Sequence, residues 1–314
     1  MSVLLETQNL MKYFKTPGGW LHAVDDVSLR IKTGKTLGVV GESGCGKSTL
    51  GRTILHLLPP TSGKILFEGK DISNIKSREF KQSRKDMQII FQDPFSSLNP
   101  RMTVEEIIME PLNIFRLHSS IKERREEVAR LMDTVGLSSR LVRTYPHELD
   151  GGRRQRIGVA RALSVNPKFI VCDEPVSALD VSIQAQILNL MQNLQEETGV
   201  TYMFITHDLS VVRHISDDIC VMYLGKLVEK TDYKELFENP CHPYTQALLA
   251  AIPIPVPHAK KGRDLLKGEL FSPINPAPGC RFAARCSKSK KECLAQDPEY
   301  KEISTGHFVA CHLF

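Results

Sequence analysis

Residues 41–49, with the sequence GESGCGKST, form the segment of this chain best suited to bind a phosphate group. The segment fits the spacing G-x-x-x-x-G-K-[ST], and it follows an apolar run and precedes an amphipathic one, so we expect it to join a strand to a helix. Glycines let the backbone wrap around phosphate oxygens, and N–H groups at a helix start donate to them. Lys47 can reach the β- and γ-phosphates of a nucleoside triphosphate, and the Ser48 hydroxyl can ligate Mg²⁺. The predicted binding residues are Gly41, Ser43, Gly44, Cys45, Gly46, Lys47, Ser48 and Thr49. We interpret Cys45 as a small filler residue rather than a redox switch.

A second candidate is the apolar run FIVC at 169–172, which ends in two carboxylates. A buried strand that ends in an acid places Asp173 where it can orient the Mg²⁺ shell. Glu174 lies one residue further on and can polarise an attacking water. Such a run is a weak signal alone, but together with the phosphate loop it predicts triphosphate hydrolysis.

Three further polar residues follow or lie close to predicted strand ends. Gln92 follows the strand expected at 87–91, His207 follows the strand expected at 201–205, and Asp180 lies just past Glu174. Ligands of open α/β sheets collect at the carboxyl ends of strands, so we expect these side chains to converge on one site. Gln92 could sense Mg²⁺ or water, and His207 could hydrogen-bond the γ-phosphate.

The elements that must position these residues alternate between short β-branched runs and amphipathic segments, which predicts an α/β core. Strands are expected at 36–40, 87–91, 169–172, 201–205 and 218–223, and a helix at 47–58. A long helical insertion lies between the second and third of these strands, and its segment 121–135 places apolar residues on one face. After Ile252 the sequence IPIPVPHAKKGRD predicts a linker.

The bulk properties are those of a globular protein of 314 residues, with a net charge of +5 that we interpret as a solvated surface of mixed charge. The length allows one large domain with a small appendage, or two domains. The sequence contains neither a membrane-length apolar run nor a leader, so we expect a cytoplasmic chain whose membrane association comes through a partner.

These motifs, in this order, resemble those of the ATP-binding subunits of ABC transporters. The order is Walker A (41–48), Q-loop (Gln92), signature (149–153), Walker B (169–173), catalytic Glu174, D-loop (177–180) and switch His207. The segments FQDPFSSLNP at 91–100, EPVSALDVSIQAQ at 174–186 and HPYTQAL at 242–248 resemble the oligopeptide/dipeptide importer ATPases. The Val-Ser after Glu174-Pro175 is more similar to the F-type subunit than to the D-type.

The resemblance implies a P-loop NTPase fold, with a RecA-like core, an antiparallel β subdomain and a helical subdomain at about 93–165. The ATP-binding domain would span 1–252, and 253–314 would hold a linker and a cysteine-rich region. Phe14 falls at the position that stacks on adenine, with Tyr13 as the rival. The implied partners are a second ATPase subunit, expected to be D-type, two membrane permease subunits and, indirectly, an extracellular binding protein. The chain would lie at the cytoplasmic face of the membrane, and ATP and Mg²⁺ would be its ligands.

The signature, in the form Leu149-Asp-Gly-Gly-Arg153, departs from the family's Leu-Ser-Gly-Gly-Gln. Asp150 replaces the serine that donates to the γ-phosphate of the partner's ATP, while Gly151 and Gly152 keep their N–H groups at a helix start. One interpretation is that Asp150 only caps the helix at 152–164. The alternative is that the two ATP sites of the dimer are unequal, with slow turnover at the site that faces Asp150.

Four cysteines near the C-terminus are spaced C-x5-C-x6-C-x17-C, namely Cys280, Cys286, Cys293 and Cys311. The spacing alone leaves zinc, iron–sulfur and plain reduced thiols open. The importer ATPases share a similar Asn-Pro-x-Pro-Gly-Cys entry, here at 275–280, and this resemblance favours a [4Fe–4S] cluster, with Zn²⁺ as the alternative. Arg281, Arg285 and Lys288 would then offset the negative charge of the cluster.

Two rival functions come from other classes of protein. A nucleic-acid ATPase usually has long coiled coils or tandem ATPase domains, and this sequence has neither, so we expect no nucleic-acid partner. In a regulatory binder the four thiols would sense redox state. The transported solute is open as well: peptides are the first expectation, and oligosaccharides or nickel are the alternatives.

Overall fold

The computed structural model describes residues 2–75, 77–252 and 272–314. The described chain divides into two compact units. The first combines Met1–Lys32, Thr36–Ser73 and Phe204–Phe314, and the second combines Thr33–Lys35 with Asn74–Met203. The linker predicted after Ile252 falls on 253–271, outside the described residues.

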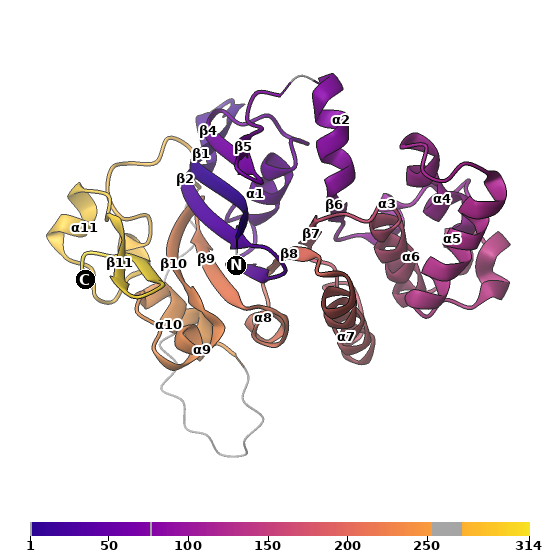
Figure 1. The fold of residues 1–314 in the computed structure, drawn as a ribbon. Coiled ribbons are helices and arrows are strands. Elements are labelled where there is room, and N and C mark those ends of the chain that lie inside the picture. Colours follow the sequence, from indigo (N-terminus) through magenta and orange to yellow (C-terminus); the bar gives the residue numbers. More distant parts are fainter. Residues whose placement is uncertain (1, 76, 253–271) are drawn as a thin grey trace, which may run out of the picture. The chain divides into compact units, whose positions relative to one another are not determined.

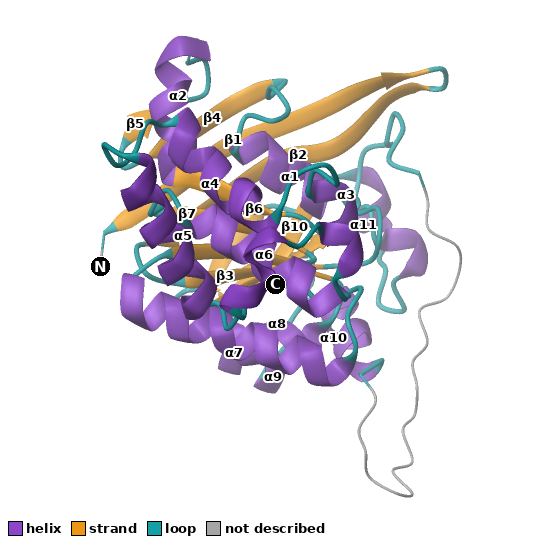
Figure 2. Cartoon of the chain, turned by 90° about the vertical axis from the view of Figure 1, so that its right-hand side faces the viewer, coloured by secondary structure: helices purple, strands orange, loops and turns teal. Residues whose placement is uncertain are grey.

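An antiparallel sheet in the first unit has the strand order β2-β1-β4-β5. Its strands are β1 (Val3–Thr16), β2 (Gly19–Lys32), β4 (Ser62–Phe67) and β5 (Lys70–Asp71). The first two strands form a long hairpin, which Figure 2 shows from the side. Leu5, Leu10, Val24 and Val27 are fully buried and supply the inner face of this hairpin.

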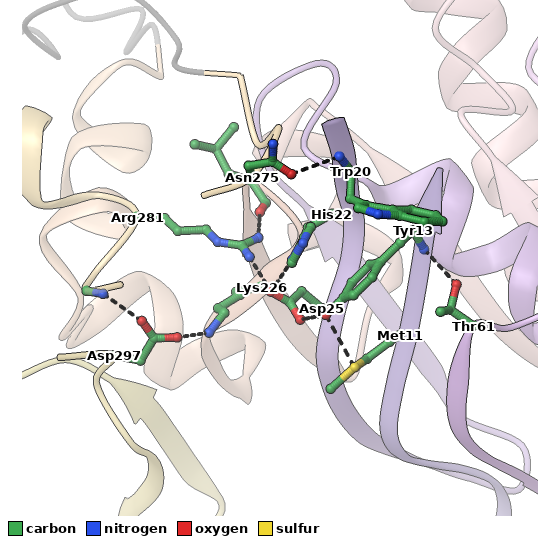
Figure 3. Close-up of polar contacts among 12 residues, drawn as sticks. Met11, Tyr13, Trp20, His22, Asp25, Thr61, Lys226, Asn275, Arg281 and Asp297 are labelled. Atoms are coloured by element: carbon green, nitrogen blue, oxygen red, sulfur yellow. Dashed lines mark hydrogen bonds and ion pairs between the residues drawn. The ribbon is translucent and has the colours of Figure 1, made fainter. Parts of the chain in front are cut away.

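The free edge of β2 is covered by residues that follow the undescribed segment. The N–H of His22 donates to the Pro273 carbonyl at 2.9 Å, and the N–H of Asn275 donates to the Trp20 carbonyl at 2.9 Å. The Asn275 side-chain oxygen accepts from the Trp20 N–H at 2.8 Å (Figure 3). A short stretch at 273–275 therefore pairs with β2 as an additional strand would.

The remaining strands of the first unit pair in the order β11-β12-β10-β9-β3. They are β3 (Thr36–Val40), β9 (Asp218–Tyr223), β10 (Lys226–Asp232), β11 (Tyr300–Ser304) and β12 (His307–Ala310). β3 and β9 run parallel and have the predicted bounds, and every residue of β3 is buried. β12 pairs with β10, so the C-terminal hairpin extends the core sheet of this unit (Figure 1).

The helices of the first unit are α1 (Lys47–Ile54), α8 (Leu209–Ile215), α9 (Tyr233–Glu238), α10 (Pro243–Ala250), α11 (Lys291–Ala295) and the 3₁₀ turn η3 (Ala283–Arg285). The helix predicted at 47–58 is wrong at its end, because α1 stops at Ile54 and His56 has a positive φ of 52°. Pro59 and Pro60 follow, and the residue before a proline disfavours helical backbone.

The second unit holds the helical insertion and two parallel strands, β6 (Met87–Ile90) and β7 (Phe169–Asp173). Its helical elements are α2 (Ser77–Asp86), α3 (Pro94–Ser97), α4 (Val104–Ile114), α5 (Ile121–Thr134), η1 (Ser139–Arg143), η2 (Pro146–Glu148), α6 (Gly151–Leu163) and α7 (Val181–Thr198). β8 (Thr201–Thr206) spans the boundary between the units. Val128, Leu131 and Met132 bury the predicted face of α5, and α4 packs on α5 and α6 (Figure 1). Among the described residues no helix has both the length and the apolar character needed to cross a bilayer.

Candidate functional site

The phosphate loop at 41–49 connects β3 to the first turn of α1, as predicted, and close backbone contacts require two of its three glycines. Gly46 has a φ of 104°, and a Cβ there would lie 1.9 Å from the Ala23 carbonyl oxygen. At Gly41 a Cβ would lie 2.2 Å from the Met222 carbonyl oxygen. Gly46 also begins α1 without a side-chain cap, the arrangement that leaves a helix start able to donate to phosphate oxygens. Ser43 and Gly44 form the exposed tip of the loop.

Lys47 is buried under the loop, and its ammonium is fixed by backbone carbonyls. Its Nζ donates to Gly41 at 2.8 Å and to Glu42 at 3.0 Å. Burial raises the pKa of the Cys45 thiol, although the charge of Lys47 opposes the shift. Cys45 is 2% exposed, which fits the interpretation of a neutral filler residue.

The two neighbouring aromatic residues of β1 have different environments. Tyr13 stacks on His22 with ring centroids 3.8 Å apart, and its hydroxyl donates to Asp25 (Figure 3). Burial and the bond to Asp25 raise the pKa of Tyr13 well above its ordinary value. Phe14 is half-buried, with the Lys12 ammonium 4.8 Å from its ring centroid. Tyr13 is therefore bound into a polar network, and Phe14 is the better candidate for an adenine platform.

In the second unit, the structure brings Gln92 and Glu174 into direct contact. β6 and β7 are parallel neighbours, so the residues after their carboxyl ends lie side by side. The Gln92 amide nitrogen donates to the Glu174 carboxylate at 2.9 Å. Asp173 ends β7 and is 1% exposed. Glu174 has a positive φ of 48°, which is unusual for a residue other than glycine and is often found at functional sites.

The signature segment lies at the start of α6, and Asp150 is its N-cap. Its Oδ1 accepts from the Arg153 N–H at 2.8 Å, and the Arg153 side chain lies 3.4 Å from the same carboxylate. A Cβ at Gly152 would lie 2.7 Å from Cγ2 of Ile183, and one at Gly151 would lie 3.1 Å from Leu179. Gly152 is therefore needed for packing against the first turn of α7, and Gly151 packs tightly against the segment just before it.

The last two predicted polar residues are exposed and adjoin helices. Asp180 precedes α7, and its carbonyl accepts from the Gln184 N–H at 2.9 Å. His207 lies between β8 and α8. It belongs to the first unit with the phosphate loop, whereas Gln92, Glu174 and Asp180 belong to the second. The convergence of all these side chains on one site stays a prediction.

The four C-terminal cysteines gather in one region of the first unit as free thiols. Burial raises the pKa of Cys280 to about 11, and the neighbouring Cys311, Cys293 and Cys286 add to the shift. The N–H of Cys280 donates to the Cys293 carbonyl at 2.7 Å. Among the described residues, the group of metal-ligating side chains whose donor atoms all lie within 4.8 Å of one another is Glu229, Cys241 and His307, so a metal centre at the four thiols stays a prediction.

The side chains of two tail arginines reach carboxylates of β2 and of the loop at 41–49. Arg281 pairs with Asp25, and Arg285 pairs with Glu42 of the phosphate loop. Lys288 donates to the Gln246 side chain at 3.3 Å. A role in offsetting the charge of a cluster was predicted for Arg281, Arg285 and Lys288, and these partners were not foreseen. For both arginines the partner carboxylate lies more than 200 residues away in the sequence. No sequence signal pointed to them.

Sequence reasoning also missed a buried group around Glu229. One carboxylate oxygen accepts from the Cys241 N–H at 2.7 Å and bonds the His307 ring at 2.8 Å. The other accepts from the His242 N–H at 2.9 Å. The thiol, ring and carboxylate donor atoms lie within 4.8 Å of one another, which is also compatible with a metal ion. Because backbone N–H groups already bind both oxygens of the Glu229 carboxylate, we interpret the group as a structural contact that holds together β10, β12 and the start of α10.

Comparison with known proteins decides the family. Residues 24–177 match the model of the ABC transporter family, and residues 228–293 match the model of the oligopeptide/dipeptide transporter C-terminal region. The chain is 54% identical to the oligopeptide transport ATP-binding protein AppF of Bacillus subtilis, over 99% of this chain and 97% of that protein. It belongs to the ABC transporter ATP-binding family. The oligopeptide transport ATP-binding protein OppF of Escherichia coli is 52% identical, over 99% of this chain and 93% of that protein.

Solved structures of ABC ATP-binding cassettes share the fold. A dimeric post-hydrolysis cassette MJ0796, bound to ADP and Pi, superposes with a TM-score of 0.68 at 31% identity, covering 73% of this chain and 99% of that one. The cassette cbiO1 of Clostridium perfringens superposes with a TM-score of 0.67 at 28% identity, over 76% and 92% of the two chains. The predicted α/β fold of a P-loop ATPase is therefore confirmed for this member of the ABC family.

Proposed function

We propose that this chain is the ATP-hydrolysing subunit of an ABC importer for peptides. The observation that carries the proposal is the nearly end-to-end match, at 54% identity, to an oligopeptide transport ATP-binding protein. The chain would work as a dimer with a second ATPase subunit, of D-type, on two membrane permease subunits that receive peptide from an extracellular binding protein. It would thus lie at the cytoplasmic face of the membrane.

The residues have the following roles in this proposal. The phosphate loop binds the triphosphate of ATP, Lys47 contacts its β- and γ-phosphates, and Phe14 stacks on adenine. Ser48 and Gln92 would bind Mg²⁺, with Asp173 orienting its outer shell, and the ion would offset the charge of the phosphates. The amide nitrogen of Gln92 donates to Glu174, so the amide oxygen of Gln92 is the atom that would face the ion.

Glu174 polarises the attacking water, and Gln92 holds the carboxylate that does so. His207 hydrogen-bonds the γ-phosphate, and Asp180 belongs to the D-loop. The signature residues 150–153 contact the partner's ATP rather than the chain's own. The ATP-binding domain spans 1–252, with its helical subdomain at about 93–165, and 253–314 holds the linker and the cysteine-rich region.

Reconstitution tests the function. The chain is co-purified with its permease and partner ATPase subunits, and ATP hydrolysis is measured with binding protein that carries peptide. We expect stimulation by peptide, its loss in Glu174→Gln, and no loss in Glu126→Gln, an exposed carboxylate on α5. Stimulation by an oligosaccharide or by nickel but not by peptide would transfer the chain to another importer class. A complex without permease subunits would refute the importer assignment.

Asp150 motivates a second part of the proposal, that the two ATP sites are unequal. The site built on this chain's Glu174 and His207 would turn over quickly, and the partner's ATP, facing the Asp150 carboxylate, slowly. Glu174→Gln in the assembled complex should then remove nearly all ATP hydrolysis. If most of the activity persists, the sites are not unequal in this sense and Asp150 is only a helix cap.

We also propose that Cys280, Cys286, Cys293 and Cys311 hold a [4Fe–4S] cluster, with Zn²⁺ as the alternative. The support for this is the resemblance of the entry at 275–280 to that of the importer ATPases, together with the closeness of Cys280 to the other three cysteines. Anaerobic purification followed by iron, sulfide and zinc analysis decides between the two. A colourless sample with one zinc per chain would reject the cluster, and a metal-free one would reject both.

A further inference from the structure

The segment 280–286 of the cysteine-rich tail is attached directly to the phosphate loop. Arg285 binds Glu42 with both terminal nitrogens, at 2.7 and 3.1 Å, in the forked geometry that makes arginine–carboxylate pairs strong and directional. Only 6% of the Arg285 side chain is exposed, so water screens this pair weakly. The backbone of Glu42 is fixed as well, because its N–H donates to the Tyr244 hydroxyl at 2.9 Å.

Arg281 holds the turn that supports the loop. Its guanidinium donates to the Leu224 carbonyl and to Asp25 (Figure 3). Gly225, which follows Leu224 in this turn, donates its N–H to the Cys45 carbonyl at 2.8 Å, and its own carbonyl accepts from the Asp25 N–H at 2.9 Å. The phosphate loop therefore has two attachments to the tail, a direct one through Glu42 and an indirect one through Gly225.

Phe282, between the two arginines, anchors the segment in the core. It is 2% exposed and packs against Tyr223 and Tyr244, with ring centroids 5.2 and 5.4 Å apart. Aromatic pairs of this kind add to the stabilisation that burial alone gives. A rigid anchor means that a displacement of the segment displaces both arginines together.

We propose that Arg285 and Arg281 are positioning residues for ATP, and that they couple the binding of ATP at the phosphate loop to the stability of the tail segment 280–286. The proposal rests on the proposed function, since it concerns ATP at the same loop. Arg285 holds the backbone of the loop through Glu42, and Arg281 holds the turn that receives the Cys45 carbonyl. Neither side chain is assigned a contact with ATP.

The physical basis is preorganisation. A loop held in its binding conformation does not lose conformational entropy again when the phosphates bind, so its affinity is higher than that of a loose loop. Coupling between two sites is reciprocal, so ATP must stabilise the tail segment to the same extent. Cys280 and Cys286 flank the two arginines, so the segment that ATP stabilises includes two of the four C-terminal thiols.

The first test measures the affinity of the full-length chain for a non-hydrolysable ATP analogue by titration calorimetry, with thermal unfolding measured in parallel. We expect Arg285→Gln to weaken binding about fivefold or more, and Arg285→Lys, which keeps the charge but not the fork, to weaken it less. Arg30→Gln is the matched control, because Arg30 pairs with Glu6 at the surface of the same unit. Glu42→Gln removes the pair from its other side, so the test does not depend on one variant folding, and its effect should not add to that of Arg285→Gln.

The second test uses hydrogen exchange of peptides that cover 280–286, with and without the analogue. The wild-type segment should exchange more slowly with the analogue bound, and this protection should vanish in Arg285→Gln. An Arg285→Gln variant that unfolds at a lower temperature but binds the analogue with wild-type affinity would overturn the proposal, as would protection that persists in that variant. A wild-type chain that does not bind the analogue at all would refute the proposed function instead.

Discussion

The N-cap of α6 gives a prediction that tests the capping role of Asp150. Replacing Asp150 with Ala removes the carboxylate that accepts the Arg153 N–H at 2.8 Å. A lost cap costs about 1 kcal/mol, and the lost interaction of a negative charge with the helix start adds about 0.3–1 kcal/mol. The ion pair with Arg153 adds at most a few tenths of a kcal/mol, since 61% of the Asp150 side chain is exposed. We expect a total of about 1–2 kcal/mol.

The measurement is the free energy of opening of α6, obtained from hydrogen exchange of its amides. Asp150→Ser restores the residue common in the family and keeps a capping oxygen, so it should cost less than about 0.5 kcal/mol. Glu126→Ala, on the exposed face of α5, controls for the loss of a surface acid. The capping interpretation would be refuted by an Asp150→Ala variant in which α6 opens as in the wild type. The capping interpretation would also be refuted if Asp150→Ser lowered the free energy of opening of α6 as much as Asp150→Ala does. That result would assign the effect to the lost negative charge.

Three further outcomes are expected. Gly152→Ala should lower the free energy of unfolding by about 1–3 kcal/mol, because its Cβ would lie 2.7 Å from Ile183. The loss should be smaller in an Ile183→Ala background, where the clashing side chain is shortened. Urea denaturation measures both losses, and equal losses would exclude the clash. Cys45→Ala should leave the affinity for ATP unchanged in calorimetry, because the buried thiol is a filler, whereas a large loss would give it a binding role. Burial would raise the pKa of Asp25, but the Tyr13 hydroxyl and Arg281 outweigh it and hold that pKa below its ordinary value. The stabilisation by Asp25 is therefore present above about pH 4 and is lost as the pH falls through the lowered pKa. Asp25→Asn should reduce the fall in unfolding temperature between neutral and acid pH. An unchanged fall would contradict the linkage.

Much of the local structure follows from the sequence because local physics determines it. The runs that became β3 and β9 are short, apolar and rich in β-branched residues, and their bounds were predicted without error. The capping role of Asp150 was predictable as well, because a cap depends on neighbours three residues away. α1 was predicted too long, since its amphipathic pattern continues to the prolines while the backbone turns at His56.

Contacts between distant segments could not be predicted in this way. Arg285 and Glu42 are 243 residues apart in the chain, and each has an ordinary local explanation as a surface charge. Cys241 lies far from the four C-terminal cysteines in the sequence, although its pKa is raised by burial, by Glu229 and Glu235, and by Cys311 nearby. Only the folded chain shows that such residues share an environment, because one sequence carries no signal for pairs brought together by topology.

The pairing of residues 273–275 with β2 has a consequence for the solubility of the chain. β2 is the outer strand of its sheet, and an uncovered outer strand offers N–H and C=O groups to the strands of other molecules. The bonds from His22 to Pro273 and between Trp20 and Asn275 occupy these groups, so the tail protects the sheet from edge-to-edge aggregation. A chain that ends before Pro273 would expose this edge, together with the edge of β10 that β12 covers and with Trp20, a residue that is already 51% exposed, and it should self-associate where the full chain does not.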